Sequence, residues 1–378
     1  MSTDAHYLDP VTGRSFPLSI PLWRSPDDIP LMISPLPGIG RDEIDRETRS
    51  IWRYRAALPL AIEKPVSLGE GLTPLIEGRL PSGSVHFKLE WFAPTGSFKD
   101  RGASVMLSYL RQLGVAAILE DSSGNGGAAI AAYGAAAGIR VRILTPATTQ
   151  PAKLAQMRAF GAEVQLVPGP REESEREAIR QSDQIFYASH NWQAFFLQGT
   201  KLLAYELWED HGFSIPDNIV IPTGAGSNVL GCNIGFSELL RAGQIKKLPR
   251  LFAAQPQNCA PIHAAFMAGA DDLVPTTTSA TIAEGTAIKR PVRMRQLLQA
   301  IRQSNGATVA VSEQEITSAV ANLARIGLYA EPTSAVAAAA AEQLLASGAI
   351  SPAERTVVLL TGSGLKASAF MTELFGKA

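Results

Sequence analysis

Residues 115–137 contain the sequence pattern that decides the fold. They begin Val115-Ala116-Ala117-Ile118-Leu119, pass through Ser122-Ser123-Gly124-Asn125-Gly126-Gly127, and continue with mostly small residues at 128–137. The first run has the length and apolar character of a buried strand, and the last suits a helix that packs tightly against a sheet. A strand that enters a helix through a glycine-rich turn is the basic unit of an α/β fold.

The same unit repeats along the chain. Strand-like and helix-like segments alternate from about Val85, and Asn218–Pro222 begins a second block that leads through another glycine turn into a helix toward Leu240. This alternation predicts an α/β fold of two domains with an open, mostly parallel sheet. Further expected elements are strands at 141–144, 164–167 and 356–360 and a helix at 151–160.

Size and charge favour a small-molecule partner. The chain has 378 residues, 46% of them hydrophobic, and 34 basic against 35 acidic residues give a net charge of −1. Such a chain can build two cores, and its nearly neutral charge provides no field that recruits nucleic acid or an anionic membrane. We therefore expect no nucleic-acid or membrane partner.

Cysteine usage and hydropathy favour the cytoplasm. Cys232 and Cys259 are the two cysteines, and neither lies in a histidine–cysteine cluster, so no disulfide framework and no metal site is expected. No apolar secretory signal occurs near the N-terminus. The alanine-rich residues 335–341 are too short to span a bilayer and are expected to form a buried helix.

The glycine turns lie where ligands collect in an open parallel sheet, beyond the carboxyl ends of strands. Gly224-Ala225-Gly226-Ser227-Asn228 places small residues at a helix start, so several backbone N–H groups can approach a phosphate. An ordinary chain reversal is one alternative. A nicotinamide-dependent oxidoreductase is a lesser one, because the third glycine and the distal acidic residue of the dinucleotide-binding pattern are missing.

Two other turns carry polar side chains. The turn at 122–127 can hold a substrate carboxylate through backbone N–H groups and Ser123, and Asn125 can donate a hydrogen bond to a phenolate oxygen. Thr361 follows the last expected strand and can place a hydroxyl on a ring nitrogen. A simple strand-to-helix turn and a polar strand end are the alternative interpretations.

Lys99 connects these turns to one chemistry. It lies in Gly96-Ser97-Phe98-Lys99-Asp100-Arg101-Gly102, where a glycine turn precedes a helix start. A primary amine held there suits imine formation with an aldehyde cofactor, which also needs a phosphate clamp and a partner for its ring nitrogen. The combination predicts pyridoxal 5'-phosphate. For Lys99 alone, the alternative is a solvated lysine beside a capping pattern of Ser97 and Asp100.

The chain resembles the threonine synthase and serine/threonine dehydratase branch of the fold-type II pyridoxal phosphate enzymes, also called the tryptophan synthase β superfamily. The resemblance covers roughly residues 68–366. It is carried, in order, by Gly69-Glu70-Gly71-Leu72-Thr73-Pro74-Leu75, the lysine motif at 96–102, the asparagine turn at 122–127 and the terminal segment at 360–366.

The resemblance implies a role for each matching position. Lys99 is the catalytic residue and forms the covalent link to the cofactor aldehyde, Asn125 contacts the ring oxygen, and Thr361 meets the pyridine nitrogen. The cofactor phosphate is held by Gly224, Ala225, Gly226, Ser227 and Asn228. Expected substrate contacts are Thr73, Ser122, Ser123, Gly124, Gly126 and Glu284.

It also implies a domain arrangement. An N-terminal arm or subunit-contact segment is expected at 1–65. A large cofactor-binding domain is expected at 66–97 and 192–378, and a smaller substrate-facing domain at 98–191. A homodimer follows by analogy with relatives.

Two departures from the threonine synthase pattern affect the substrate. Threonine synthases carry an arginine that grips the substrate phosphate just before a Leu-Glu-Gly-Gln-Lys-like segment, whereas Phe195 and Phe196 precede the corresponding residues 197–201 here. The nearby residues 189–191 include His190 and offer other donors to an anion. Residues 281–291, with Glu284, are more similar to the dehydratase loop, and Glu331 either borders the site or caps a helix.

The expected activity is that of a pyridoxal phosphate-dependent lyase acting on a small L-amino acid by elimination or elimination with replacement. Threonine synthase is the closest named activity. A serine/threonine dehydratase or another amino-acid ammonia-lyase is the main alternative. A non-catalytic binding homologue is a lesser one, because Lys99, Asn125 and Thr361 are all present.

Overall fold

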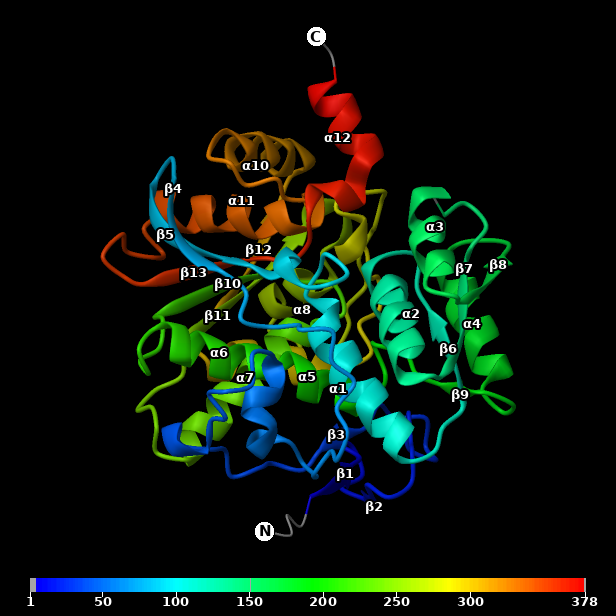
Figure 1. The fold of residues 1–378 in the computed structure, drawn as a ribbon. Coiled ribbons are helices and arrows are strands. Elements are labelled where there is room, and N and C mark those ends of the chain that lie inside the picture. Colours follow the sequence, from blue (N-terminus) through cyan, green and yellow to red (C-terminus); the bar gives the residue numbers. More distant parts are fainter. Residues whose placement is uncertain (1–4, 150, 377–378) are drawn as a thin grey trace. The chain divides into compact units, whose positions relative to one another are not determined.

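The computed structural model describes residues 5–149 and 151–376, which divide into two compact units (Figure 1). Unit 1 comprises the chain up to Leu72 together with Ala93–Thr95 and Lys99–Leu202. Unit 2 comprises Thr73–Phe92, Gly96–Phe98 and the chain from Leu203 onward. The larger sheets are mainly parallel and alternate with helices, which confirms the α/β class. The domain boundaries expected from the sequence stay a prediction.

Unit 1 contains a parallel sheet in the order β8-β7-β6-β9. Its strands are β6 (Ala117–Asp121), β7 (Arg140–Pro146), β8 (Glu163–Val167) and β9 (Phe186–Tyr187). Its helices are α1 (Lys99–Gln112), α2 (Asn125–Ala137), α3 (Pro151–Ala159), α4 (Arg171–Gln181) and α5 (Ala194–Thr200). The elements predicted between residues 115 and 167 are confirmed with small shifts at their ends.

The largest shift in a strand is at β6, which continues through Glu120 and Asp121. Both carboxylates are buried at the end of the strand. The Tyr187 hydroxyl and the Ser189 hydroxyl both donate to Asp121, the latter at 3.2 Å. Hydropathy alone predicted the strand to stop earlier, because partners so distant in the sequence leave no local signal.

The N-terminal part of unit 1 forms a small antiparallel sheet of β1 (His6–Leu8), β2 (Ser15–Pro17) and β3 (Met32–Ile33). The Tyr7 hydroxyl donates to the Tyr109 hydroxyl at 2.8 Å, and the Tyr109 ring stacks on Phe195 with 3.6 Å between centroids. Trp23 packs edge-on against Tyr187 and Trp192, at 5.0 and 5.4 Å. This segment is therefore packed into unit 1 by aromatic contacts.

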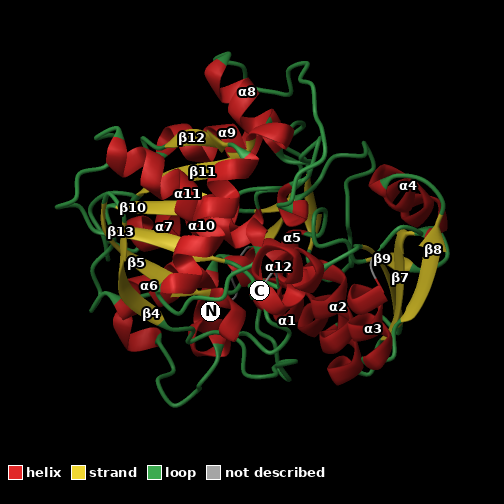
Figure 2. Cartoon of the chain, turned by 90° about the horizontal axis from the view of Figure 1, so that it is seen from above, coloured by secondary structure: helices red, strands yellow, loops and turns green. Residues whose placement is uncertain are grey.

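Unit 2 contains a six-stranded sheet in the order β12-β11-β10-β13-β5-β4, in which β4 alone runs antiparallel to its neighbour (Figure 2). Helices α10 and α11 cover one face, and α6 and α7 the other (Figure 1). Its strands are β4 (Leu75–Leu80), β5 (Gly83–Leu89), β10 (Asn218–Pro222), β11 (Arg250–Pro256), β12 (Ala307–Val311) and β13 (Thr356–Leu360). Its helices are α6 (Leu202–Asp210), α7 (Ser227–Arg241), α8 (Pro261–Met267), α9 (Met294–Gln303), α10 (Glu313–Arg325), α11 (Pro332–Ala346) and α12 (Ser368–Phe375).

Several predictions for unit 2 are confirmed. Strands β10 and β13 have the expected bounds, because each is a five-residue apolar run that is buried along its whole length. The alanine-rich run at 335–341 lies buried inside α11. Small side chains let this helix lie close to the sheet.

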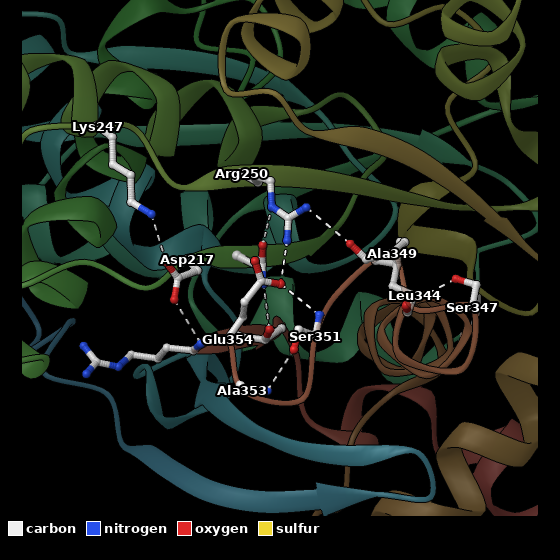
Figure 3. A network of polar contacts seen from close by, with 12 residues as sticks. Asp217, Lys247, Arg250, Leu344, Ser347, Ala349, Ser351, Ala353 and Glu354 are labelled. Atoms are coloured by element: carbon white, nitrogen blue, oxygen red, sulfur yellow. Dashed lines mark hydrogen bonds and ion pairs between the residues drawn. The ribbon is translucent and has the colours of Figure 1, made fainter.

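A polar network holds together the amino ends of the central strands of unit 2 (Figure 3). The Arg250 guanidinium donates to Asn218 Oδ1 and to Glu354 Oε2, each at 2.7 Å. Asp217 pairs with Lys247 at 3.0 Å and accepts from the backbone N–H of Arg355 at 3.1 Å. The network connects the starts of β10, β11 and β13. Because it lies at the amino ends of these strands, it leaves their carboxyl ends available for ligands.

Candidate active site

Lys99 is the first residue of α1 in unit 1. Its Nζ atom lies 5.5 Å from the centroid of the Phe196 ring. The Asp100 carboxylate accepts hydrogen bonds from the backbone N–H of Thr95, at 2.7 Å, and from the Thr95 hydroxyl. The Ser97 hydroxyl is buried and has no partner among the described residues. The capping pattern of Ser97 and Asp100 is therefore not formed, and Thr95 fixes the start of the helix instead.

The predicted substrate turn at 122–127 joins β6 to α2 in the same unit. Helix α2 begins at Asn125, and its N-cap, Gly124, supplies no side-chain hydrogen bond. Ser122 Oγ accepts from the Gly124 N–H at 3.4 Å. The first N–H groups of a helix lack partners within the helix and suit a carboxylate. The binding of a substrate carboxylate by this turn stays a prediction.

Gly126 in this turn lies against His190. A Cβ atom at position 126 would come within 2.7 Å of His190 Cε1 and 2.9 Å of Ser122 Oγ. His190 donates its backbone N–H to Glu120 Oε2 at 3.1 Å, and its Nδ1 atom contacts Glu120 Oε1. Glu120 was not among the sequence candidates, because its place in the sequence has the pattern of a polar strand end.

The predicted phosphate turn follows β10 in unit 2. Gly226 has φ of +85° and is the N-cap of α7, without a side-chain hydrogen bond. A Cβ atom on Gly226 would lie 2.1 Å from Leu297, and one on Gly224 would lie 3.0 Å from the Gly285 carbonyl oxygen. The positive φ therefore favours glycine at Gly226, and a side chain at Gly224 would be tight against its neighbour. Small residues at these positions leave the backbone N–H groups at the helix start accessible.

Asn228 tests whether this turn fits a phosphate. Its side chain is 2% exposed, and neither its Oδ1 nor its Nδ2 atom has a hydrogen-bond partner among the described residues. A buried amide without partners is costly in a folded protein and is typical of a ligand contact. The small-residue turn, the helix dipole and this amide fit the phosphate of pyridoxal phosphate.

Thr361 directly follows β13 and is buried. Its hydroxyl lies 3.3 Å from that of Ser334, and its carbonyl oxygen accepts from the Phe98 N–H at 3.0 Å. Ser334 in turn bonds both the N–H and the carbonyl of Gly362. Ser334 was not among the sequence candidates, because it lies inside an alanine-rich helix.

Two predicted substrate contacts have different surroundings. Thr73 is buried in unit 2, and its hydroxyl donates to Glu90 at 2.7 Å within a network that includes Lys88 and Glu206. Glu284 lies in a short 3-10 turn, Glu284–Thr286, and its side chain is exposed. Their roles as substrate contacts stay predictions.

The place at which the resemblance expects an arginine is occupied by aromatic rings. Phe195 is buried against Tyr109, and Phe196 packs so closely on α1 that a Cβ at Gly102 would lie 2.5 Å from its ring. Neither ring can grip a phosphate by charge. The departure seen in the sequence is therefore also present in the structure.

The α/β fold, together with a lysine at one helix start and a phosphate-type glycine turn at another, defines an enzyme of the fold-type II pyridoxal phosphate class. Residues 66–362 match the model of the family described as pyridoxal-phosphate dependent enzyme. The chain belongs to this family, and pyridoxal phosphate is its cofactor. It is a cofactor-dependent lyase.

Curated relatives include two archaeal threonine synthases. That of Methanocaldococcus jannaschii is 35% identical over 338 residues, which cover 87% of this chain and 83% of the relative. That of Methanosarcina acetivorans is 34% identical over 337 residues, with the same coverage.

Solved structures share the fold at lower identity. Maize serine racemase aligns with a TM-score of 0.69 at 20% identity, covering 80% of this chain and 92% of that one. The L-serine ammonia-lyase of Rhizomucor miehei also gives 0.69, at 23% identity, covering 81% and 98%. Within residues 5–149 and 151–376, no helix has the length and apolar character needed to cross a membrane.

Proposed function

We propose that the protein catalyses elimination, alone or followed by replacement, on a small L-amino acid, with threonine synthase as the closest named activity. The observation that carries the proposal is Lys99 at the start of α1, in the unit that also holds the turn at 122–127. The identity to threonine synthases over most of both chains supports it.

Each residue then has a defined task. Bound pyridoxal phosphate supplies the electron sink that makes the α-proton of an amino acid acidic. The Lys99 amine holds the cofactor in the resting enzyme and, once substrate displaces it, takes the α-proton. Asn125 binds the cofactor ring oxygen, and the turn at 122–127 binds the substrate carboxylate.

Thr361 biases the outcome of the reaction. A neutral hydroxyl beside the pyridine nitrogen does not favour the protonated ring as a carboxylate would. With the cofactor bound, the Thr361 hydroxyl would stabilise negative charge on the ring less well than a carboxylate, so loss of a leaving group from a neighbouring carbon would compete better. We therefore propose elimination rather than transamination.

A dehydratase or ammonia-lyase is the second candidate, and Phe195 and Phe196 are the specific observation in its favour. Without a guanidinium at that place, a phosphorylated substrate loses its expected clamp. A substrate whose leaving group is a hydroxyl does not need that clamp.

The test is a substrate panel with product identification. Purified holoenzyme is given O-phospho-L-homoserine, L-threonine and L-serine separately. Phosphate with L-threonine as products supports a threonine synthase, whereas a 2-oxo acid with ammonia supports a dehydratase. Consumption of none of the three, with the visible spectrum of bound cofactor intact, would favour a non-catalytic binding homologue.

The covalent role of Lys99 is tested separately. Borohydride reduction followed by peptide mapping is expected to place the label on Lys99, and the Lys99→Ala variant is expected to take up no label. A label on another lysine in cofactor-saturated protein contradicts the assignment.

The proposal extends to a cytoplasmic homodimer. It is supported by the two buried cysteines and by the resemblance to cofactor-dependent metabolic enzymes. Sedimentation of the purified holoenzyme tests the oligomeric state.

A further inference from the structure

Glu120 and His190 form a buried pair that the mechanism above does not use. Glu120 is fully buried and His190 is 5% exposed. One Glu120 oxygen accepts the His190 backbone N–H at 3.1 Å, and the other contacts the ring atom Nδ1. The carboxyl group therefore fixes both the backbone and the ring of His190, although the two residues are 70 positions apart in the sequence.

The ring of His190 lies among the residues expected to handle substrate. It packs against Gly126 in the predicted carboxylate-binding turn, and its centroid lies 5.7 Å from that of Phe196. Phe196 in turn faces the Lys99 amine. Among the described residues no hydrogen-bond partner reaches the second ring nitrogen, Nε2. This atom is also not one of the fully buried side-chain atoms that lack a partner. It is thus open to a ligand.

The surrounding charges set where the protons lie. Burial lowers the pKa of His190 well below its ordinary value, and the positive charges of Lys99 on α1 and Arg171 on α4 lower it further. Burial, with the negative charge of Asp121 beside it on β6, raises the pKa of Glu120 well above its ordinary value, while Lys99 and Arg171 oppose this rise. Both directions favour an uncharged pair, with a proton on Glu120 shared with Nδ1 and a second proton on Nε2.

We propose that His190 is a further catalytic residue, which donates the Nε2 proton to the departing oxygen of the substrate side chain, and that Glu120 is its positioning residue and proton source. This inference rests on the proposed elimination. It also gives a reason for the two rings that replace the arginine, since a hydroxyl leaves as water and needs a proton rather than a cationic clamp.

The step balances without another reactant. The carbon–oxygen bond breaks with its electron pair on oxygen, and the Nε2 proton passes to that oxygen. Nδ1 then takes the proton of Glu120, which becomes a carboxylate near Lys99 and Arg171. In a replacement reaction the same path runs backward: Nε2 accepts a proton from the attacking water while Nδ1 returns its proton to Glu120.

The experiment compares two leaving groups in holoenzyme. L-Serine loses a hydroxyl, which needs a proton, whereas β-chloro-L-alanine loses chloride, which does not. For His190→Gln we expect kcat with L-serine to fall by roughly 100-fold or more, the usual contribution of a general acid. The loss with β-chloro-L-alanine should be at least about tenfold smaller, because proton donation is the function removed.

Two further variants separate chemistry from folding. Glu120→Gln retains a group that can hold the ring but cannot supply the proton, so kcat with L-serine should fall while KM stays unchanged. His263→Gln removes a histidine of unit 2 and should leave kcat unchanged with both substrates. Cofactor absorbance and the unfolding midpoint are measured for every variant.

A direct readout of the ring is available in ¹⁵N-histidine-labelled protein. His190, assigned by its absence in His190→Gln, should remain neutral with the proton on Nε2 between pH 6 and 8. A ring that titrates near its ordinary pKa of about 6.5 overturns the proposal.

The kinetic outcomes distinguish two failures. Equal losses with both substrates, or no loss with either, overturn the donor role and leave the proposed function intact. A wild-type holoenzyme that consumes neither L-serine nor β-chloro-L-alanine overturns the donor role, and one that also leaves O-phospho-L-homoserine and L-threonine unchanged overturns the proposed elimination as well.

Discussion

At the scale of a residue, the Asn228 side chain is expected to lower the stability of the cofactor-free protein and to raise its affinity for the cofactor. Its buried amide has no partners in the described structure, so the folded protein bears the cost of removing that group from water. Replacing it by leucine removes this cost, which is about 1–3 kcal/mol for such a group. We expect Asn228→Leu to unfold at a higher temperature than the wild type when both are free of cofactor.

The same variant should bind pyridoxal phosphate at least about tenfold more weakly, which corresponds to the loss of about 1.4 kcal/mol. Thermal unfolding and a fluorescence titration with the cofactor check the two halves. Asn233→Leu, further along α7, is the matched control, since its Oδ1 atom is also unpartnered but it lies outside the turn. An unchanged cofactor affinity in Asn228→Leu would contradict its assignment to the phosphate site.

At the scale of elements, the contact between α1 and α5 depends on Gly199. A Cβ atom there would lie 2.1 Å from the backbone oxygen of Arg101 and 2.7 Å from Cα of Gly102. Backbone atoms cannot move aside as side chains do, so we expect Gly199→Ala to destabilise the protein by about 3 kcal/mol or more. Urea unfolding measures the change.

Gly83→Ala is the control for this substitution, because its Cβ would meet only side-chain atoms of Leu345, the nearest at 3.3 Å. It should change the free energy of unfolding by no more than about 1 kcal/mol. Similar losses in both variants would show that close approach of α1 and α5 is not the cause.

Elements were predictable from the sequence where local signals agree. Strand β10 is an apolar run that ends at a glycine turn, and its predicted bounds are those observed. The two-residue strand β9 and the N-terminal strands were missed because they are too short to show a period.

The candidate site was predictable only in part, for a physical reason. Lys99 and the turns are visible because glycines and helix starts lie beside them in the sequence. The contact of Glu120 with His190 is not visible, because a carboxylate at a strand end has the same local pattern whether it faces water or a histidine 70 residues away.

At the scale of the whole molecule, the N-terminal segment contributes to the stability of unit 1. The Trp23 ring lies edge-on to Tyr187 and Trp192 and beneath the Arg24 guanidinium, 4.1 Å from the ring centroid. We expect Trp23→Ala to lower the free energy of unfolding by about 2–3 kcal/mol, because both packing and aromatic contacts are lost.

Limited proteolysis should then cut the segment before Leu72 faster than in the wild type. Ile20→Ala serves as the control, since Ile20 is 52% exposed and its change should stay within about 0.5 kcal/mol. A Trp23→Ala protein with wild-type unfolding and cleavage would mean that the segment is held by other contacts.

Because of the network around Arg250 and Glu354, the residues that support the sheet of unit 2 are different from those proposed for chemistry. The amino ends of the strands carry mechanical support, and the carboxyl ends carry the residues proposed for chemistry. Substitutions at one rim of the sheet should therefore alter which substrates are accepted, while substitutions at the other should alter how durable the scaffold is.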